Sequence, residues 1–133
     1  MAKPTHQDAT LMLQLAQFMV TSGAQEAKDW IWSDQFVPEY SVFAEKYPPG
    51  TEGYLKASTT CGYFETVGTL HKHGLLNEDL LFDWLAVSMI WDRIKGFALG
   101  LRQAAEEPRL YENFEAMAKA NVEYDARSPK GKV

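Results

Sequence analysis

The sequence predicts an all-α fold, a single antiparallel bundle of about four to six helices joined by short loops. Apolar residues recur at steps of three and four in most segments, which is the spacing of one helical face. Glycine and proline fall between these segments, and no run of β-branched residues predicts a strand. Short connections favour antiparallel neighbours, so the segments are expected to pack as a bundle.

The N-terminal third is expected to hold one longer helix and two short ones. The first helix covers about 8–21 and stops before Gly23. A short helix over 24–32 follows, and Pro38 prevents its continuation because proline lacks a backbone donor. A second short helix is expected from about residue 38, and the YPPG sequence at 47–50 ends it.

Three longer helices are expected in the remainder. One runs over 52–73 and is stopped by Gly74, and the next runs over about 78–105 after Asn77 as its cap. Pro108 is expected in the first turn of the last helix. The 78–105 segment is the expected centre of the bundle, because its first half is apolar on more than one side and several neighbours must cover it. Seven of its apolar residues fall on one stripe: Leu80, Trp84, Val87, Trp91, Ile94, Ala98 and Leu101.

Bulk properties exclude several classes of protein. A length of 133 residues suits one domain, expected over 1–127, with 128–133 as a disordered polar tail. The net charge of -5 and the lack of a basic face argue against nucleic-acid binding. The most apolar stretch, 80–101, carries four charged residues, so no membrane span is expected. A single cysteine excludes an internal disulfide and fits a cytoplasmic location.

Two segments carry a family resemblance. YFETVGTLHKHGLLNEDLLFDWL at 63–85 and PRLYENFEAMAKAN at 108–121 together resemble a bacterial family of uncharacterised small all-helical domains. The resemblance implies a helical fold and brings no substrate, activity or cofactor with it. The positions that match are Glu65, Gly74, Glu78, Asp79, Leu80, Trp91, Arg102, Tyr111, Asn113, Phe114 and Glu115.

Glu65 is the most informative charged residue. It lies among apolar residues of the 52–73 helix, and a partly buried carboxylate needs a cation or several donors. We expect a structural ion pair with Arg93 or Arg102. The alternative is a general base or ligand anchor.

A ligand pocket is the wider alternative. It would lie between the 52–73 helix, the 78–105 helix and the helix that follows Pro108. Its lining would be Glu65, Trp91, Arg93 and Asn113.

Metal binding and nucleophilic catalysis are not expected. His71 and His73 stand two residues apart on a helix, so their side chains point in different directions, and the chain has no Glu-x-x-His pair. Cys61 lies in a run of small residues and is expected to be a buried, inert thiol rather than a nucleophile. No cofactor is expected.

These observations favour a protein that is not an enzyme and acts through association. Four Trp, six Tyr and seven Phe are many for 133 residues, and an interface would use them. The expected partner is a second copy, giving a homodimer, or another protein.

Overall fold

The computed structural model describes residues 3–128 and 131, and within them every regular element is a helix. The all-α prediction is therefore confirmed. The elements are α1 (His6–Thr21), α2 (Ala24–Ile31), α3 (Tyr40–Lys46), α4 (Glu52–Lys72), α5 (Glu78–Trp84), α6 (Val87–Ala104) and α7 (Glu112–Arg127). The polar tail predicted for 128–133 lies largely outside the described residues.

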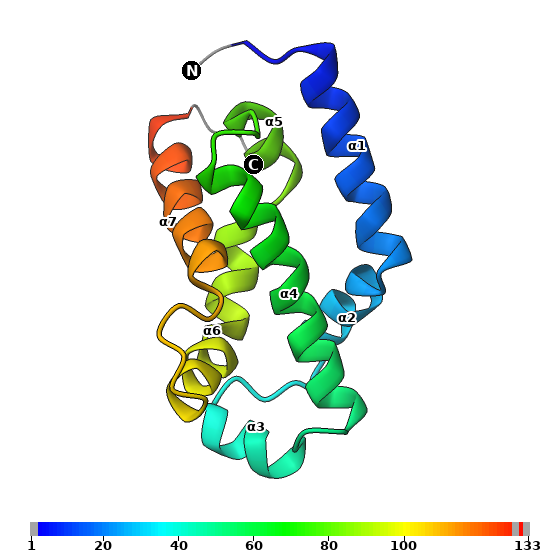
Figure 1. Ribbon diagram of the computed structural model, residues 1–133, viewed down its shortest axis with the longest axis vertical. Helices are drawn as coiled ribbons and strands as arrows, with labels where there is room; N and C mark the ends of the chain where they lie inside the picture. Colours follow the sequence, from blue (N-terminus) through cyan, green and yellow to red (C-terminus); the bar gives the residue numbers. More distant parts are fainter. Residues whose placement is uncertain (1–2, 129–130, 132–133) are drawn as a thin grey trace.

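The longest helix, α4, runs through the middle of the molecule (Figure 1). It packs most extensively against α7 on one side and α2 on the other, and α6 packs against α7. Its ends are set locally: the Thr51 hydroxyl accepts from the Tyr54 backbone N–H at 3.3 Å, and Gly74 adopts a left-handed φ of 72° after the last turn. The stop predicted at Gly74 is confirmed.

The helix expected over 78–105 is two helices, so the described chain has seven helices rather than four to six. Leu85 adopts an extended conformation (φ -117°, ψ 126°), which ends α5 and lets the chain turn into α6. No glycine or proline marks this break in the sequence. The turn is stabilised by burial of Leu81, Phe82 and Leu85, so tertiary packing overrides the local helical pattern.

The last helix begins at Glu112 instead of at Pro108. Glu106 and Tyr111 both have positive φ, at 55° and 58°. These two left-handed residues bound a short connection, and Tyr111 blocks a helix that starts earlier. The expectation for Pro108 was therefore wrong.

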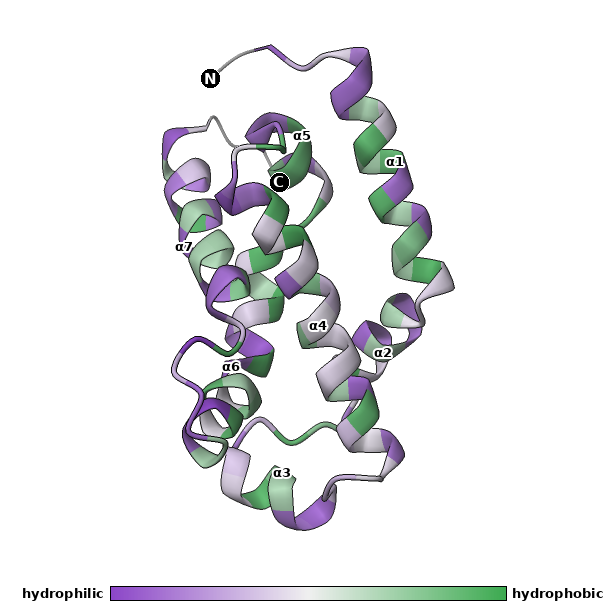
Figure 2. Cartoon of the chain, viewed as in Figure 1, coloured by the Kyte–Doolittle hydropathy of each residue, from purple (hydrophilic) through white to green (hydrophobic). Residues whose placement is uncertain are grey.

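The first helix lies along one edge of the molecule (Figure 1). It buries Leu15 and Met19 against the body, and the Tyr63 hydroxyl from α4 donates to the Leu15 carbonyl. Figure 2 shows apolar residues along most of its length. Over the described residues, no helix combines the length and apolar character that crossing a membrane requires.

Candidate functional site

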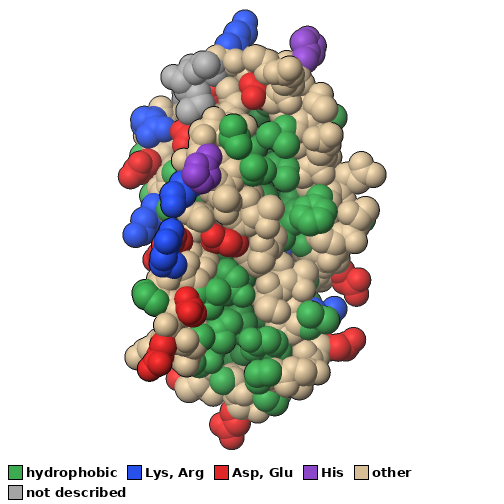
Figure 3. Space-filling model, viewed as in Figure 1, with side chains coloured by type: hydrophobic (Ala, Val, Ile, Leu, Met, Phe, Trp, Pro, Cys, Tyr) green, Lys and Arg blue, Asp and Glu red, His purple; other side chains and the backbone are tan. Residues whose placement is uncertain are grey.

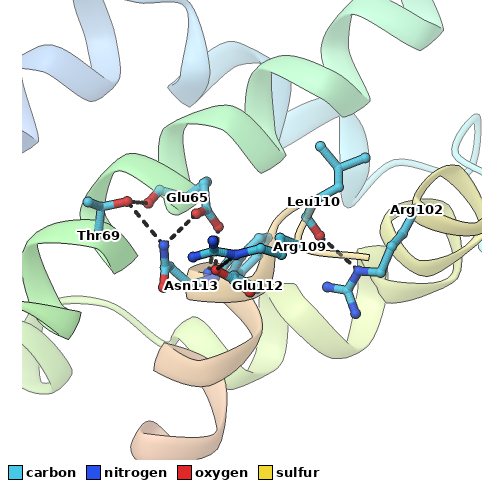
Figure 4. A network of polar contacts seen from close by, with 8 residues as sticks. Glu65, Thr69, Arg102, Arg109, Leu110, Glu112 and Asn113 are labelled. Atoms are coloured by element: carbon cyan, nitrogen blue, oxygen red, sulfur yellow. Dashed lines mark hydrogen bonds and ion pairs between the residues drawn. The ribbon is translucent and has the colours of Figure 1, made fainter. Parts of the chain in front are cut away.

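Glu65 on α4 and Asn113 on α7 meet in a network of polar contacts between these two helices (Figure 4). One carboxylate oxygen of Glu65, Oε1, accepts the backbone N–H groups of Asn113 and Phe114, both at 3.0 Å. The other, Oε2, accepts the Asn113 side-chain amide at 2.8 Å. Three donors therefore satisfy one half-buried carboxylate.

The contact is an N-cap supplied by another helix. The first residue before α7, Tyr111, makes no side-chain capping bond. Asn113 and Phe114 are the second and third residues of α7, and their N–H groups are the ones that a local cap would satisfy. The Glu65 charge also lies at the positive end of the α7 dipole, which favours a carboxylate there.

The expected ion pair of Glu65 with Arg93 or Arg102 does not form between these described residues. Arg93 donates instead from Nε to the Ile31 carbonyl at 2.9 Å and from an η nitrogen to the Ser33 carbonyl at 3.0 Å. These carbonyls lie at the C-terminal end of α2. Arg93 thus joins α6 to the C-terminal end of α2.

Arg102 stabilises the loop that connects α6 to α7. Its Nε donates to the Leu110 carbonyl at 2.9 Å, and Nη1 forms an ion pair with Glu115 at 3.1 Å. Its remaining nitrogen, Nη2, is buried and has no hydrogen-bond partner within the part of the chain that the structure describes. The arginine therefore holds the loop ahead of α7, close to the helix start that Glu65 caps (Figure 4).

The four residues expected to line one ligand pocket are not brought together. Trp91 is only 7% exposed, and its ring packs edge-on to Phe114 with centroids 4.9 Å apart. Arg93 faces α2, and Glu65 is occupied by α7. Of the four, Asn113 alone lines one of the described grooves.

That groove lies between α4 and α7 and has a volume of about 470 Å³. Its lining is Gly68, His71, Lys72, Arg109, Glu112, Asn113 and Ala116. Three of its polar side chains already have partners: Arg109 pairs with Glu112 at 2.9 Å, and His71 Nε2 lies 2.8 Å from a Glu78 carboxylate oxygen. Lys72 is the lining cation for which the structure records no ion pair.

Cys61 is fully buried on α4. Burial raises the pKa of its thiol, and the negative charge of Glu65 raises it further. Its thiolate is therefore strongly disfavoured. Among residues 3–128 and 131, no group of three or more His, Cys, Asp or Glu side chains is arranged to hold a metal ion.

Sequence reasoning missed the role of Asn121, which is only 2% exposed on α7. Its side-chain oxygen accepts the Ser88 backbone N–H at 2.9 Å, in the first turn of α6. The cap residue of α6, Ala86, makes no side-chain capping bond. The signal available in the sequence is an amide four residues after Met117, on the apolar stripe of this helix.

The fold and this cluster define an all-helical domain whose central polar residues join helices to one another. The chain belongs to the family described as Domain of unknown function (DUF4760), whose model matches residues 4–120. No curated protein and no solved structure matches the chain.

Proposed function

We propose that this protein acts by associating with another protein chain, and not by catalysis. The polar side chains of the cluster are already used by the fold: Glu65, Asn113 and Arg102 are engaged in contacts that hold helices together. Both oxygens of the Glu65 carboxylate are engaged by the three donors, which leaves it poorly placed to contact a substrate proton.

The observation that carries the proposal is the number of large apolar side chains left in solvent. The exposed ones are Leu13, Phe18, Val20, Trp32, Val42, Leu55, Leu75, Met89, Leu99 and Val122. On the face in Figure 3, hydrophobic side chains gather in two areas, one between α1 and α5 and one toward α3. Apolar surface of this kind is buried favourably when two chains associate.

Light scattering of the purified chain over a range of concentrations tests the homodimer form of this proposal. The monomer mass is 15.1 kDa, and we expect the measured mass to rise toward twice this value with concentration. A constant mass of 15.1 kDa at every concentration would contradict self-association.

A small-molecule role is the second candidate, favoured by the groove of about 470 Å³ beside Asn113. Its Asn113, Lys72 and Glu112 side chains would select a small polar molecule. A thermal-shift screen of polar metabolites tests it, with Lys72→Ala as the comparison variant. A ligand that raises the melting temperature of the wild type but not of the variant supports the groove, whereas no shift from any compound counts against it.

We further propose a cytoplasmic location. It is supported by the single cysteine, which is buried and unpaired in the fold. Fractionation of the source cells with an antibody against the chain tests this directly.

A further inference from the structure

The first helix has two apolar faces that adjoin each other. One face carries Leu15 and Met19, which are buried against the body. The other carries Ala9, Leu13, Ala16 and Val20, at steps of four, three and four. Leu13 and Val20 are 63% and 65% exposed, the highest values among the large exposed hydrophobic side chains. We call these four residues the outer stripe of α1.

The helix is also free of charge around this stripe. No residue from Ala9 to Gln25 is charged, although the chain carries 31 charged residues from its 13 basic and 18 acidic ones. Solvent-facing helix surfaces are normally rich in charge, and an uncharged apolar stripe is typical of a surface that another helix covers. A partner helix can cover it without burying an ionised group.

We infer that the outer stripe of α1 binds the same stripe of a second copy, with the two helices antiparallel. This inference rests on the proposed function and identifies its partner and its surface. The stripe is self-complementary in that arrangement. Under a two-fold axis between residues 14 and 15, Leu13 faces Ala16 of the second copy, and Val20 faces Ala9. Each large side chain meets a small one, which lets the helices approach closely.

Two further features favour a second copy in this orientation. Antiparallel helices place the positive end of each dipole beside the negative end of the other. The helix α1 lies along an edge of the molecule (Figure 1), and within the stripe Leu13 and Val20 are exposed while Ala9 and Ala16 are half-buried, so another helix has room to pack there. Four residues on one helix of 16 residues bury less than the roughly 800 Å² per partner of a standard interface. We therefore expect a weak dimer.

The first test compares apolar-to-polar variants by sedimentation equilibrium. We expect the double variant Leu13→Gln, Val20→Gln to raise the dimer Kd at least about tenfold. Leu55→Gln is the matched control, because Leu55 is 62% exposed on α4 and lies off the stripe. All three positions are exposed, so circular dichroism should show unchanged helix content and a similar melting temperature.

The second test determines the orientation by disulfide formation in a Cys61→Ala background. Ala9→Cys and Val20→Cys proteins of different mass are oxidised separately and as a mixture. Antiparallel packing brings the two positions together, so the mixture should give a mixed disulfide. Like positions lie about 16 Å apart along the axis and should not link, because a disulfide needs Cα atoms within about 7 Å.

Three results overturn the inference in different ways. A wild-type dimer that survives the double variant but dissociates in Leu55→Gln places the interface elsewhere and leaves the proposed association intact. Disulfides between like positions show a parallel pair. A wild type that is monomeric throughout overturns the self-association itself, and binding of that monomer to anionic lipid vesicles would assign the stripe to a membrane surface.

Discussion

The Glu65 carboxylate on α4 caps the α7 helix at Asn113, through two backbone N–H groups and one side-chain amide. These residues are 48 positions apart in the chain. The contact positions the start of α7 against the middle of α4, at the most extensive helix–helix contact of the fold. Removing this contact should lower the free energy of unfolding more than it changes any binding affinity.

Replacing Glu65 by alanine should lower the free energy of unfolding by about 2 kcal/mol, because two helix-end N–H groups and a half-buried amide lose their acceptor. Glu65→Gln keeps one acceptor oxygen and should lose less. Urea unfolding followed by circular dichroism measures both, with Glu123→Ala on the exposed side of α7 as a control. If Glu65 were an unsatisfied ligand anchor, its removal would instead leave stability unchanged or raise it.

Two glycines of α4 should respond in opposite directions to alanine. A Cβ at Gly68 would lie 2.5 Å from the Asn113 carbonyl oxygen, and a Cβ at Gly62 would meet no atom within 4 Å. Gly68→Ala should therefore destabilise the fold by separating α4 from α7. Gly62→Ala should stabilise it by up to about 1 kcal/mol, because alanine is the better helix former.

Thermal melts of these two variants measure the difference. Equal melting temperatures would contradict the close approach of α4 and α7 at Gly68. A lower melting temperature for Gly62→Ala would show that another group covers this exposed position.

High pH should weaken the hydrogen bond by which Tyr63 of α4 holds α1. Burial raises the pKa of Tyr63 to about 12 from its ordinary value of 10.0. The folded state therefore favours the neutral hydroxyl that donates to the Leu15 carbonyl. This stability is fully present below pH 10.0 and is lost as the pH rises toward about 12.

Tyr63→Phe lacks the ionisable group and should lose less stability between these two pH values. Urea unfolding of both proteins at a series of pH values checks this difference. Parallel pH profiles for the two proteins would be inconsistent with a buried Tyr63 hydroxyl.

Asn121→Ala should destabilise the start of α6. The variant leaves the Ser88 N–H without its acceptor, and Asn121 is 2% exposed, so water cannot readily replace it. We expect a loss of about 1–2 kcal/mol in urea unfolding. Val122→Ala, at the exposed neighbouring position, should change stability little. Similar losses from both variants would argue against a capping role.

Local signals in the sequence were enough to predict the helical class and the ends of α4. The left-handed Gly74 and the Asn77 cap, whose side chain accepts from the Leu80 N–H at 3.2 Å, act within one or two turns of their own helix. Such signals are readable because the interacting groups are close in sequence. The α4 and α7 segments that carry the family resemblance also proved to be the ones in contact.

The candidate site could not be predicted in this way. The caps supplied by Glu65 and Asn121 act on helices far away in the sequence, at separations of 48 and 33 residues. The apolar neighbours of Glu65 identified it as a half-buried carboxylate that needs partners. The sequence could not show whether those partners are an arginine side chain or the backbone N–H groups of a distant helix, because backbone donors leave no pattern in the sequence. The break at Leu85 is likewise set by packing and not by a turn residue.

Association through α1 is the central claim, and hydrogen exchange measured by mass spectrometry at low and high protein concentration tests it most directly. We predict that amides of residues 9–20 become more protected at high concentration, while those of the exposed side of α7 do not change. Protection of 9–20 that is independent of concentration, in a sample whose mass does rise, would contradict the assignment of the interface to α1.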